Sequence, residues 1–168
     1  MLTNKRPQGL LRFFLRMPIL LYRARLGRLL GDRFLMLTHL GRKSDLPREV
    51  VLEVVHHDLE TDAYFIAAGW REKADWFLNI QVNPQVHVMV NRRLFYAQAQ
   101  ISQPPKAAEI FYIYALRHPK AFRELSRMMT GTVMQPTKDD CFNLAQSVPL
   151  VMLMPAARSH MDEGENND

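Results

Sequence analysis

Hydrophobic residues along the chain gather in six short runs that are separated by polar or proline-containing segments. Each run has the length of a strand in a globular protein and is rich in aliphatic or aromatic residues. One of them, LFYAQAQI, alternates apolar and polar positions, as a strand with one buried face does. The expected strands are Phe34–Thr38, Arg48–Val55, Tyr64–Ala68, Gln85–Val90, Leu94–Ile101 and Pro149–Met154.

Four other segments place apolar residues at helical spacing. The first carries Trp76, Phe77 and Ile80 on one face, with Asp75 as the predicted N-cap and the Asn83–proline step as its end. The expected helices are Ala74–Asn83, Lys106–Arg117, Lys120–Met129 and Asp139–Gln146. In the second helix the residues expected to align on one face are Ala108, Phe111, Tyr112 and Ala115.

Six short strands interrupted by helices, with the last strand returning from the far end of the chain, favour a small barrel or a strongly curved sheet. We therefore predict a mainly β fold with helices (α+β), with about six strands, helical inserts and an N-terminal helix. No repeat or low-complexity linker indicates a second domain in these 168 residues. The expected division is a basic N-terminal segment (residues 1–33), the barrel domain (34–155) and an acidic, disordered tail (156–168).

Composition narrows the possible chemistry. Cys141 is the only cysteine, so we expect neither a disulfide framework nor a multi-cysteine metal site, and a reducing, cytoplasmic location fits. The adjacent His56 and His57 would point to opposite faces of a strand, which makes them a poor chelate, and no metal site is predicted. The chain also lacks GxSxG, HExxH, phosphate-loop and paired-carboxylate motifs, so a hydrolase or a metalloenzyme has little support.

Charge is unevenly distributed along the chain. Residues 1–48 contain eleven Lys or Arg and two Asp or Glu, a net of +9, so the rest must sum to −4 to give the total of +5. Such asymmetry suggests an anionic partner for the N-terminal third: nucleic acid, an anionic membrane surface or a phosphorylated cofactor. Nucleic acid ranks last, because the cations are not interleaved with aromatic residues in a recognisable module.

Residues 10–30 mix leucine and phenylalanine with five arginines. The longest uncharged run, Met17–Tyr22, is far too short to cross a bilayer, which takes about 20 apolar residues. A basic amphipathic helix lying on the inner face of a membrane is one interpretation. A helix that covers the protein's own core is the other, and it is favoured because such stripes usually pack against their own domain.

The stretch from Phe34 to Arg48 ends in an unusually cationic turn, GRKSDLPR. A tight turn needs a glycine and a polar residue or two, but not three cations. The residues that can jointly face one anion are Arg42, Lys43, Ser44 and Arg48. Charged hydrogen bonds are worth roughly 1.5–3 kcal/mol each, so three or four of them hold a phosphate. The alternative is a solvated basic hairpin turn, and the phosphate interpretation is slightly favoured.

Two further segments could carry function. Gly69 and Trp70 follow a strand, and Trp76 lies just beyond, so the tryptophans could form a wall beside a planar ligand. For Trp76 simple packing in the core is favoured, whereas for Trp70 a ligand wall and a partly exposed packing role both remain open. Tyr114 and His118 lie near a proline break between two helices, where either side chain could donate a proton. Aromatic residues in such places more often only fill the core or the surface.

Several motifs, taken together, resemble the deazaflavin-dependent nitroreductase and quinone-reductase family. They are LTHLGRKSDLPR, GWREKADWFLNIQVNPQVHV, RRLFYAQAQ, RHP and VPLVMLMP, in this order from Phe34 to Pro155. The resemblance implies a split β-barrel related to flavin reductases and pyridoxamine-phosphate oxidases. It also implies a bound coenzyme F-420 (a deazaflavin) or, as in distant relatives, FMN.

The resemblance assigns roles to positions of this sequence. The residues implied to hold the coenzyme's phosphate and acidic tail are Arg42, Lys43, Ser44 and Arg48. Those implied to line or flank the deazaflavin ring are Ala67, Ala68, Gly69, Trp70, Lys73, Trp76 and Asn79. The chain departs from the family pattern at Asp45, where glycine is usual, at Gly69, where some members have serine, and at 118–122, where nitroimidazole-reducing members are tyrosine-rich.

These motifs together imply an oxidoreductase that transfers a hydride from reduced F-420 to an electron-poor organic acceptor, such as a quinone or a nitro compound. Tyr114 or His118 would supply the proton. An FMN-dependent reductase of the same fold is the first alternative. A non-catalytic flavin or lipid binder, docked on a membrane through residues 10–30, is the second. The expected partner is a small-molecule substrate, and the protein could be a monomer or a homodimer.

Overall fold

The computed structural model describes residues 31–69 and 73–156, and within them six antiparallel strands form a closed barrel. Around the barrel the strands follow the order β1-β2-β3-β6-β5-β4. Their bounds are β1 Phe34–Leu40, β2 Pro47–His57, β3 Tyr64–Ala67, β4 Gln85–Val90, β5 Arg93–Ile101 and β6 Leu150–Pro155. The predicted barrel is thus confirmed, and β6 closes it by pairing with both β3 and β5.

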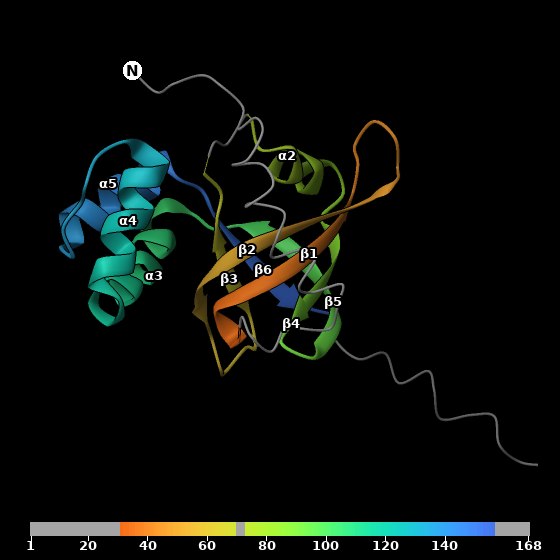
Figure 1. The fold of residues 1–168 in the computed structure, drawn as a ribbon, viewed down its shortest axis with the longest axis horizontal. Helices are drawn as coiled ribbons and strands as arrows, with labels where there is room; N and C mark the ends of the chain where they lie inside the picture. The colour runs from red at the N-terminus through yellow and green to blue at the C-terminus, as the bar shows by residue number, and fades with distance from the viewer. Residues whose placement is uncertain (1–30, 70–72, 157–168) are drawn as a thin grey trace, which may run out of the picture.

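Four α-helices and a short 3-10 turn accompany the barrel in the described residues. They are η2 Gly31–Arg33, α2 Asp75–Val82, α3 Pro104–Arg117, α4 Pro119–Thr130 and α5 Lys138–Ser147. Figure 1 shows α3, α4 and α5 gathered on one side of the barrel, whereas the β1–β2 turn projects away from them. Helix α2 lies apart from this group and contacts β1.

The hydrophobic core has two parts, one inside the barrel and one between the barrel wall and the three grouped helices. Strand β3 serves both, because successive residues of a strand point to opposite faces. Tyr64 and Ile66 pack in the barrel interior, while Phe65 and Ala67 pack with the helices. Every residue of β3 is therefore buried, which explains its continuous apolar sequence.

Several local predictions differ from the structure in detail. Asp75 is not the N-cap of α2; Ala74 is, without a side-chain hydrogen bond, and Asp75 instead forms an ion pair with Arg42. On α3 the buried stripe includes Ala107, Ile110, Phe111, Tyr114 and Ala115, whereas Ala108 and Tyr112 are only partly buried. The stripe is rotated relative to the prediction because α3 packs against both α5 and β2. Sequence spacing alone could not locate these two partners.

The remaining expectations concern segments outside the described residues. The predicted N-terminal helix and its membrane contact fall in residues 1–30, and nearly all of the predicted tail falls in 157–168. Trp70 lies in the undescribed segment 70–72. Within the part of the chain that the structure covers, no helix has the length and apolar character needed to span a membrane.

Candidate functional site

The β1–β2 turn is built around Gly41. Its amide donates to the carbonyl of Leu46 at 2.9 Å, and its carbonyl accepts from the amides of Ser44 and Asp45 at 3.0 and 2.8 Å. A Cβ atom at Gly41 would lie 2.8 Å from the Ser44 hydroxyl and 3.1 Å from Nε of Arg48. A larger residue at this position would therefore force the Ser44 and Arg48 side chains to shift, because both approach the backbone at this point.

This turn and helix α2 border an open cavity of about 390 Å³. Its lining consists of Gly41, Arg42, Lys43, Ser44, Arg48, Asp75 and Asn79. All four residues predicted to hold the phosphate thus surround a single space, and Asn79 joins them from α2. Three cationic side chains and a hydroxyl facing one cavity form a donor set suited to an anion.

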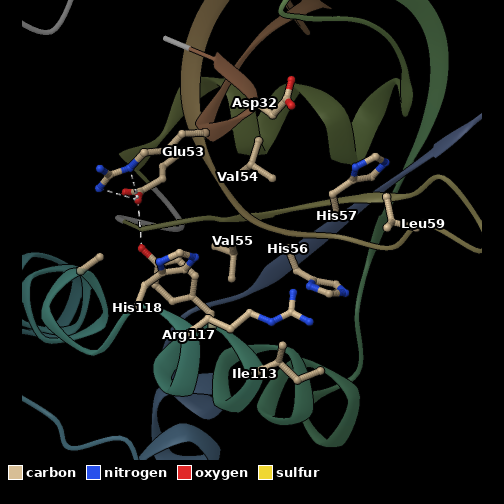
Figure 2. Close-up of a pocket in the computed structure, with 13 residues that line it drawn as sticks. Asp32, Glu53, Val54, Val55, His56, His57, Leu59, Ile113, Arg117 and His118 are labelled. Atoms are coloured by element: carbon tan, nitrogen blue, oxygen red, sulfur yellow. Dashed lines mark hydrogen bonds and ion pairs between the residues drawn. The ribbon is translucent and has the colours of Figure 1, made fainter.

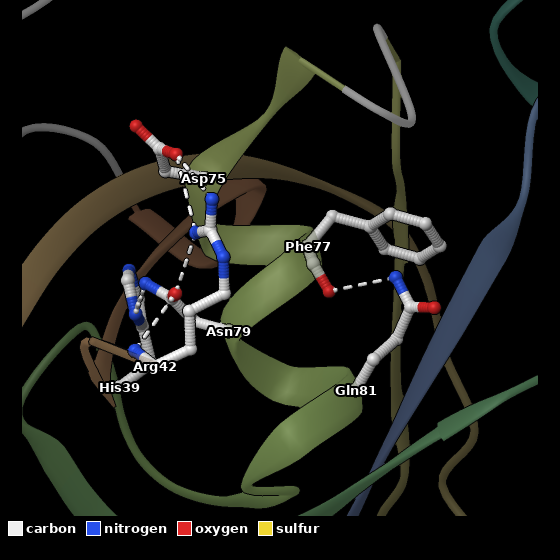
Figure 3. Close-up of polar contacts among 6 residues, drawn as sticks. All are labelled: His39, Arg42, Asp75, Phe77, Asn79 and Gln81. Carbon is white, nitrogen blue, oxygen red and sulfur yellow. Dashed lines mark hydrogen bonds and ion pairs between the residues drawn. The ribbon is translucent and has the colours of Figure 1, made fainter. Parts of the chain in front are cut away.

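Arg42 also joins the turn to helix α2. Its Nη1 atom lies 2.9 Å from Oδ1 of Asn79 and 3.2 Å from Oδ1 of Asp75, and its backbone N–H donates to the same Asn79 oxygen at 3.1 Å (Figure 3). Part of the cationic excess of the turn is therefore already paired within the protein. Lys43 and Arg48 are the exposed cations of the set.

His39 completes this network and was not among the predicted site residues. It is buried, and its Nδ1 atom lies 3.1 Å from Nδ2 of Asn79 (Figure 3). Burial lowers the pKa of His39 below its ordinary value of 6.5, and the nearby Arg48 charge acts in the same direction. The alternation of β1 could have predicted this burial, because His39 lies on the same inward-facing side of the strand as Leu35 and Leu37.

The segment predicted to line the ring lies at the end of β3. Ala67 packs with the helices, and Ala68 packs in the barrel interior, where its amide donates to the carbonyl of Pro149 at 2.8 Å. A Cβ atom at Gly69 would collide with Sδ of Met129, so this side chain of α4 fills the space that a serine there would need.

Two further residues predicted to flank the ring lie at the start of α2: Lys73 just before the helix and Trp76 in its first turn. Lys73 is exposed, and Trp76 is half-buried and packs edge-on against Phe77, with ring centroids 5.9 Å apart. Asn79, on the same helix, reaches the cationic turn. Helix α2 therefore connects the predicted ring segment with the predicted phosphate residues.

Tyr114 and His118 line a second cavity, also of about 390 Å³, between β2 and α3 (Figure 2). The hydroxyl of Tyr114 donates to Oε1 of Glu53 at 2.9 Å, and Nη2 of Arg33 approaches the same oxygen at 3.3 Å. Burial, followed by the Glu53 charge, raises the pKa of Tyr114. Tyr114 therefore keeps its proton at neutral pH and shares it with Glu53.

Strand β2 runs from one cavity to the other, although the two have no lining residue in common. Arg48 lies at the turn and Glu53 at the second cavity, five residues further along the strand. Their Cα atoms are therefore roughly 16 Å apart, at about 3.3 Å per residue. An extended ligand that carries an anionic tail and a planar ring can span this distance.

In the described part of the chain, no three His, Cys, Asp or Glu side chains are grouped so that they could hold a metal ion. His56 and His57 diverge as predicted: His57 stacks on Tyr64 at 3.9 Å between ring centroids, while His56 lies beside Phe65.

Asp45, at the position where the family resemblance implies glycine, has a left-handed backbone with φ of 53°. We expect Asp45→Gly to tighten anion binding several-fold, because removing one exposed charge beside the cations is worth about 0.2–1 kcal/mol. Stability should change little, because relief of the left-handed strain is offset by the greater freedom of glycine in the unfolded chain. Titration of coenzyme F-420, followed by fluorescence quenching, measures the effect.

Asp45→Asn is the matched control, because asparagine also tolerates the left-handed conformation but carries no charge. Equal tightening in the two variants would assign the effect to charge. Unchanged affinity in both would show that Asp45 does not act on the bound anion.

A sequence profile described as F-420H(2)-dependent quinone reductase matches residues 16–134 of the chain. Among solved structures, an F-420-H2 dependent reductase (FDR-A) is similar, with 16% identity over 73% of this chain and 95% of that one, and a TM-score of 0.51. A conserved hypothetical protein from Mycobacterium tuberculosis gives 14% identity, 84% and 91% coverage and a TM-score of 0.51. No curated protein matches the sequence.

A third similar structure is a pyridoxamine 5'-phosphate oxidase-related, FMN binding protein from Nostoc punctiforme. It is 14% identical over 83% of this chain and 80% of that one, with a TM-score of 0.50. At such identities the structures show a shared split-barrel fold, whereas the sequence profile covers well over half of the 168 residues. The chain therefore belongs to the family of F-420H(2)-dependent quinone reductases, and it is an oxidoreductase whose coenzyme is F-420.

Proposed function

We propose that the protein transfers a hydride from reduced coenzyme F-420 to an electron-poor organic acceptor, such as a quinone or a nitro compound. The observation that carries this proposal is the convergence of Arg42, Lys43, Ser44 and Arg48 on one cavity. The donor set fits the phosphate and acidic tail of such a coenzyme, because cationic side chains and a hydroxyl can hold them through charged hydrogen bonds. The bound coenzyme supplies the hydride.

The ring would extend from this turn toward the end of β3. Support comes from helix α2, which carries both Asn79 at the turn and Trp76, whose side chain packs against the barrel core that contains Ala68. Ala67 belongs to the core cluster that also contains Val55 and Tyr114, and β3 pairs with β2, so β3 borders elements that form the second cavity. A ring held here would face both Trp76 and that cavity.

We assign the acceptor to the second cavity. Val54, Val55, Ile113 and Ala121 give it apolar walls, while a few polar groups stand among them, as in typical small-molecule sites. A quinone gains two electrons with the hydride, and one proton must still reach its second oxygen. His118 is better suited than Tyr114 to deliver it, because the Tyr114 hydroxyl is held by Glu53 and its pKa is raised.

The direct test is oxidation of F-420H2 by a soluble naphthoquinone. The reaction is monitored through the absorbance of the oxidised deazaflavin, which rises as the coenzyme is oxidised. Oxidation of F-420H2 should require the protein, and it should be faster than oxidation of reduced FMN under the same conditions. Binding and oxidation of reduced FMN alone would favour the FMN-dependent alternative, which the fold shared with the FMN binding protein supports. Binding of either ring without turnover of any quinone or nitro acceptor would favour a non-catalytic binder.

We expect His118→Gln to lower kcat with the quinone by about 100-fold, the lower end of what a positioned proton donor contributes. Coenzyme affinity should not change, because His118 lies in the second cavity rather than at the cationic turn. Added imidazole should restore part of kcat, since His118 is exposed to solvent. Stopped-flow and steady-state kinetics give both quantities.

Tyr114→Phe is the matched control in the same cavity. It removes one hydrogen bond to Glu53, which costs about 0.5–1.5 kcal/mol of stability, and it should change kcat much less. A large loss of kcat in Tyr114→Phe together with a normal His118→Gln enzyme would show that the assignment of the donor is wrong.

A further inference from the structure

The buried hydrogen-bond chain from His39 through Asn79 to Arg42 carries an inference about the anion site. Asn79 and His39 are almost completely buried, at 2% and 4% exposure, directly beneath the cationic turn. Oδ1 of Asn79 accepts two hydrogen bonds from Arg42, one from the backbone N–H and one from Nη1. Nδ2 of the same amide faces Nδ1 of His39 at 3.1 Å.

These contacts determine the protonation state of His39. An amide oxygen accepts and an amide nitrogen only donates, so the two donors of Arg42 fix which end of Asn79 faces the imidazole. Nδ1 of His39 must therefore accept a hydrogen bond, and the ring is neutral with its proton on Nε2. A protonated ring would place an N–H donor against the donor of Asn79 in a buried site.

The charged groups around His39 come from three elements. Arg48 on β2 lies opposite His39 in the β1–β2 pairing and disfavours a second positive charge. Asp75 on α2 acts in the other direction but is itself paired with Arg42 of the turn. Burial is the largest influence and lowers the pKa of His39, in agreement with the hydrogen-bond geometry.

We propose that His39 is a positioning residue whose neutral form holds Asn79, and through it Arg42, in the geometry that receives the coenzyme's anionic tail. Protonation of His39 reverses the Asn79 amide and separates Arg42 from α2, so anion affinity falls in acid. The identity of the anion rests on the proposed function; the coupling of His39 to Arg42 does not.

The sign of this effect separates it from simple electrostatics. A histidine that only adds positive charge near an anion would strengthen anion binding as the pH falls. The hydrogen-bond chain requires the opposite, because the added proton removes a charged donor from its place. Stability changes in the same direction. The pKa of His39 is lower in the folded chain than its ordinary 6.5, so the free energy of unfolding decreases as the pH falls below that value.

The test is the Kd of coenzyme F-420 measured between pH 7.5 and pH 5, with circular dichroism to verify folding at each pH. The wild type should lose roughly tenfold in affinity across this range, about what one charge-assisted hydrogen bond is worth. His39→Asn offers an amide oxygen to Nδ2 of Asn79 but does not titrate. This variant should bind as the wild type does at pH 7.5 and lose little affinity in acid.

Two further variants complete the design. His87→Asn removes an exposed histidine of β4 and should keep the wild-type pH profile. His39→Leu removes the acceptor and should weaken binding at every pH. Acid-weakened binding that persists in His39→Asn would overturn the inference, even if Arg42→Ala shows that the turn binds the coenzyme. Undiminished binding in Arg42→Ala at pH 7.5 would instead count against the proposed site.

The measurement of stability is independent of any ligand. Unfolding by urea at several pH values should show a loss of stability below pH 6.5 in the wild type that is smaller in His39→Asn. If the two proteins lose stability in parallel, then His39 is not neutral in the folded chain and the inference fails.

Discussion

Replacing both Lys43 and Arg48 with alanine should weaken the binding of coenzyme F-420 by roughly 100-fold to 10,000-fold. Both side chains line the cavity of the β1–β2 turn, and both are exposed and available to an anion. Each charged hydrogen bond to a phosphate or carboxylate is worth roughly 1.5–3 kcal/mol, and about 1.4 kcal/mol corresponds to a factor of ten. Fluorescence quenching of the coenzyme gives the Kd directly.

The matched control removes the same charge from elsewhere on the surface. Arg92 and Lys120 are exposed and line neither of the two cavities described above, so their double replacement by alanine should change the Kd less than about threefold. The affinity of the wild type should also decrease with added salt, and that of Lys43→Ala/Arg48→Ala should do so less steeply. Equal affinities of Lys43→Ala/Arg48→Ala and Arg92→Ala/Lys120→Ala for the coenzyme would show that the turn is not part of the binding site.

Phe111→Ala should lower the free energy of unfolding by about 3–5 kcal/mol, as large-to-small substitutions in a close-packed core do. Phe111 is fully buried at the centre of the core between the barrel and the helices. Because a domain of this size has a stability of only about 5–15 kcal/mol, the variant should remain folded but lose about 6–20 °C in Tm. Urea unfolding followed by circular dichroism tests this.

Phe142→Ala is the matched control for that substitution. It deletes the same side chain from α5, where Phe142 is 45% exposed, and should cost less than about 1 kcal/mol. Helix α3 also carries Tyr114, so a loosened α3 should widen the cavity proposed for the acceptor and raise the KM for the quinone in Phe111→Ala. Similar losses of stability in the two variants would mean that α3 is not packed as described.

The barrel was predictable because its strands are short, apolar and clearly separated, and the motif resemblance named the same fold. The bounds moved by a few residues where pairing extended a strand past its apolar run, as at His56 and His57 in β2. The helical face of α3 was predicted less well. The predicted stripe shares Phe111 and Ala115 with the observed one, and contacts with α5 and β2 select the rotation that also buries Ile110 and Tyr114.

The cationic turn was visible in the sequence because its residues are neighbours in the chain. Arg42, Lys43, Ser44 and Arg48 lie within seven positions, and any tight turn at Gly41 brings them together. Their role as coenzyme ligands stays a prediction, as do the roles of Ala67, Gly69 and Trp76. Asp75 shows where local reasoning failed, since a favourable N-cap residue was instead used by an ion pair with the turn.

By itself, the sequence determined the elements whose causes are local: alternating strands, the glycine turn and the charges that crowd around it. Tertiary structure alone decided which distant polar groups became partners. His39 meets Asn79 across 40 positions, and Tyr114 meets Glu53 across 61. A buried donor or acceptor must find a partner wherever the fold provides one, and no periodicity in the chain encodes that choice.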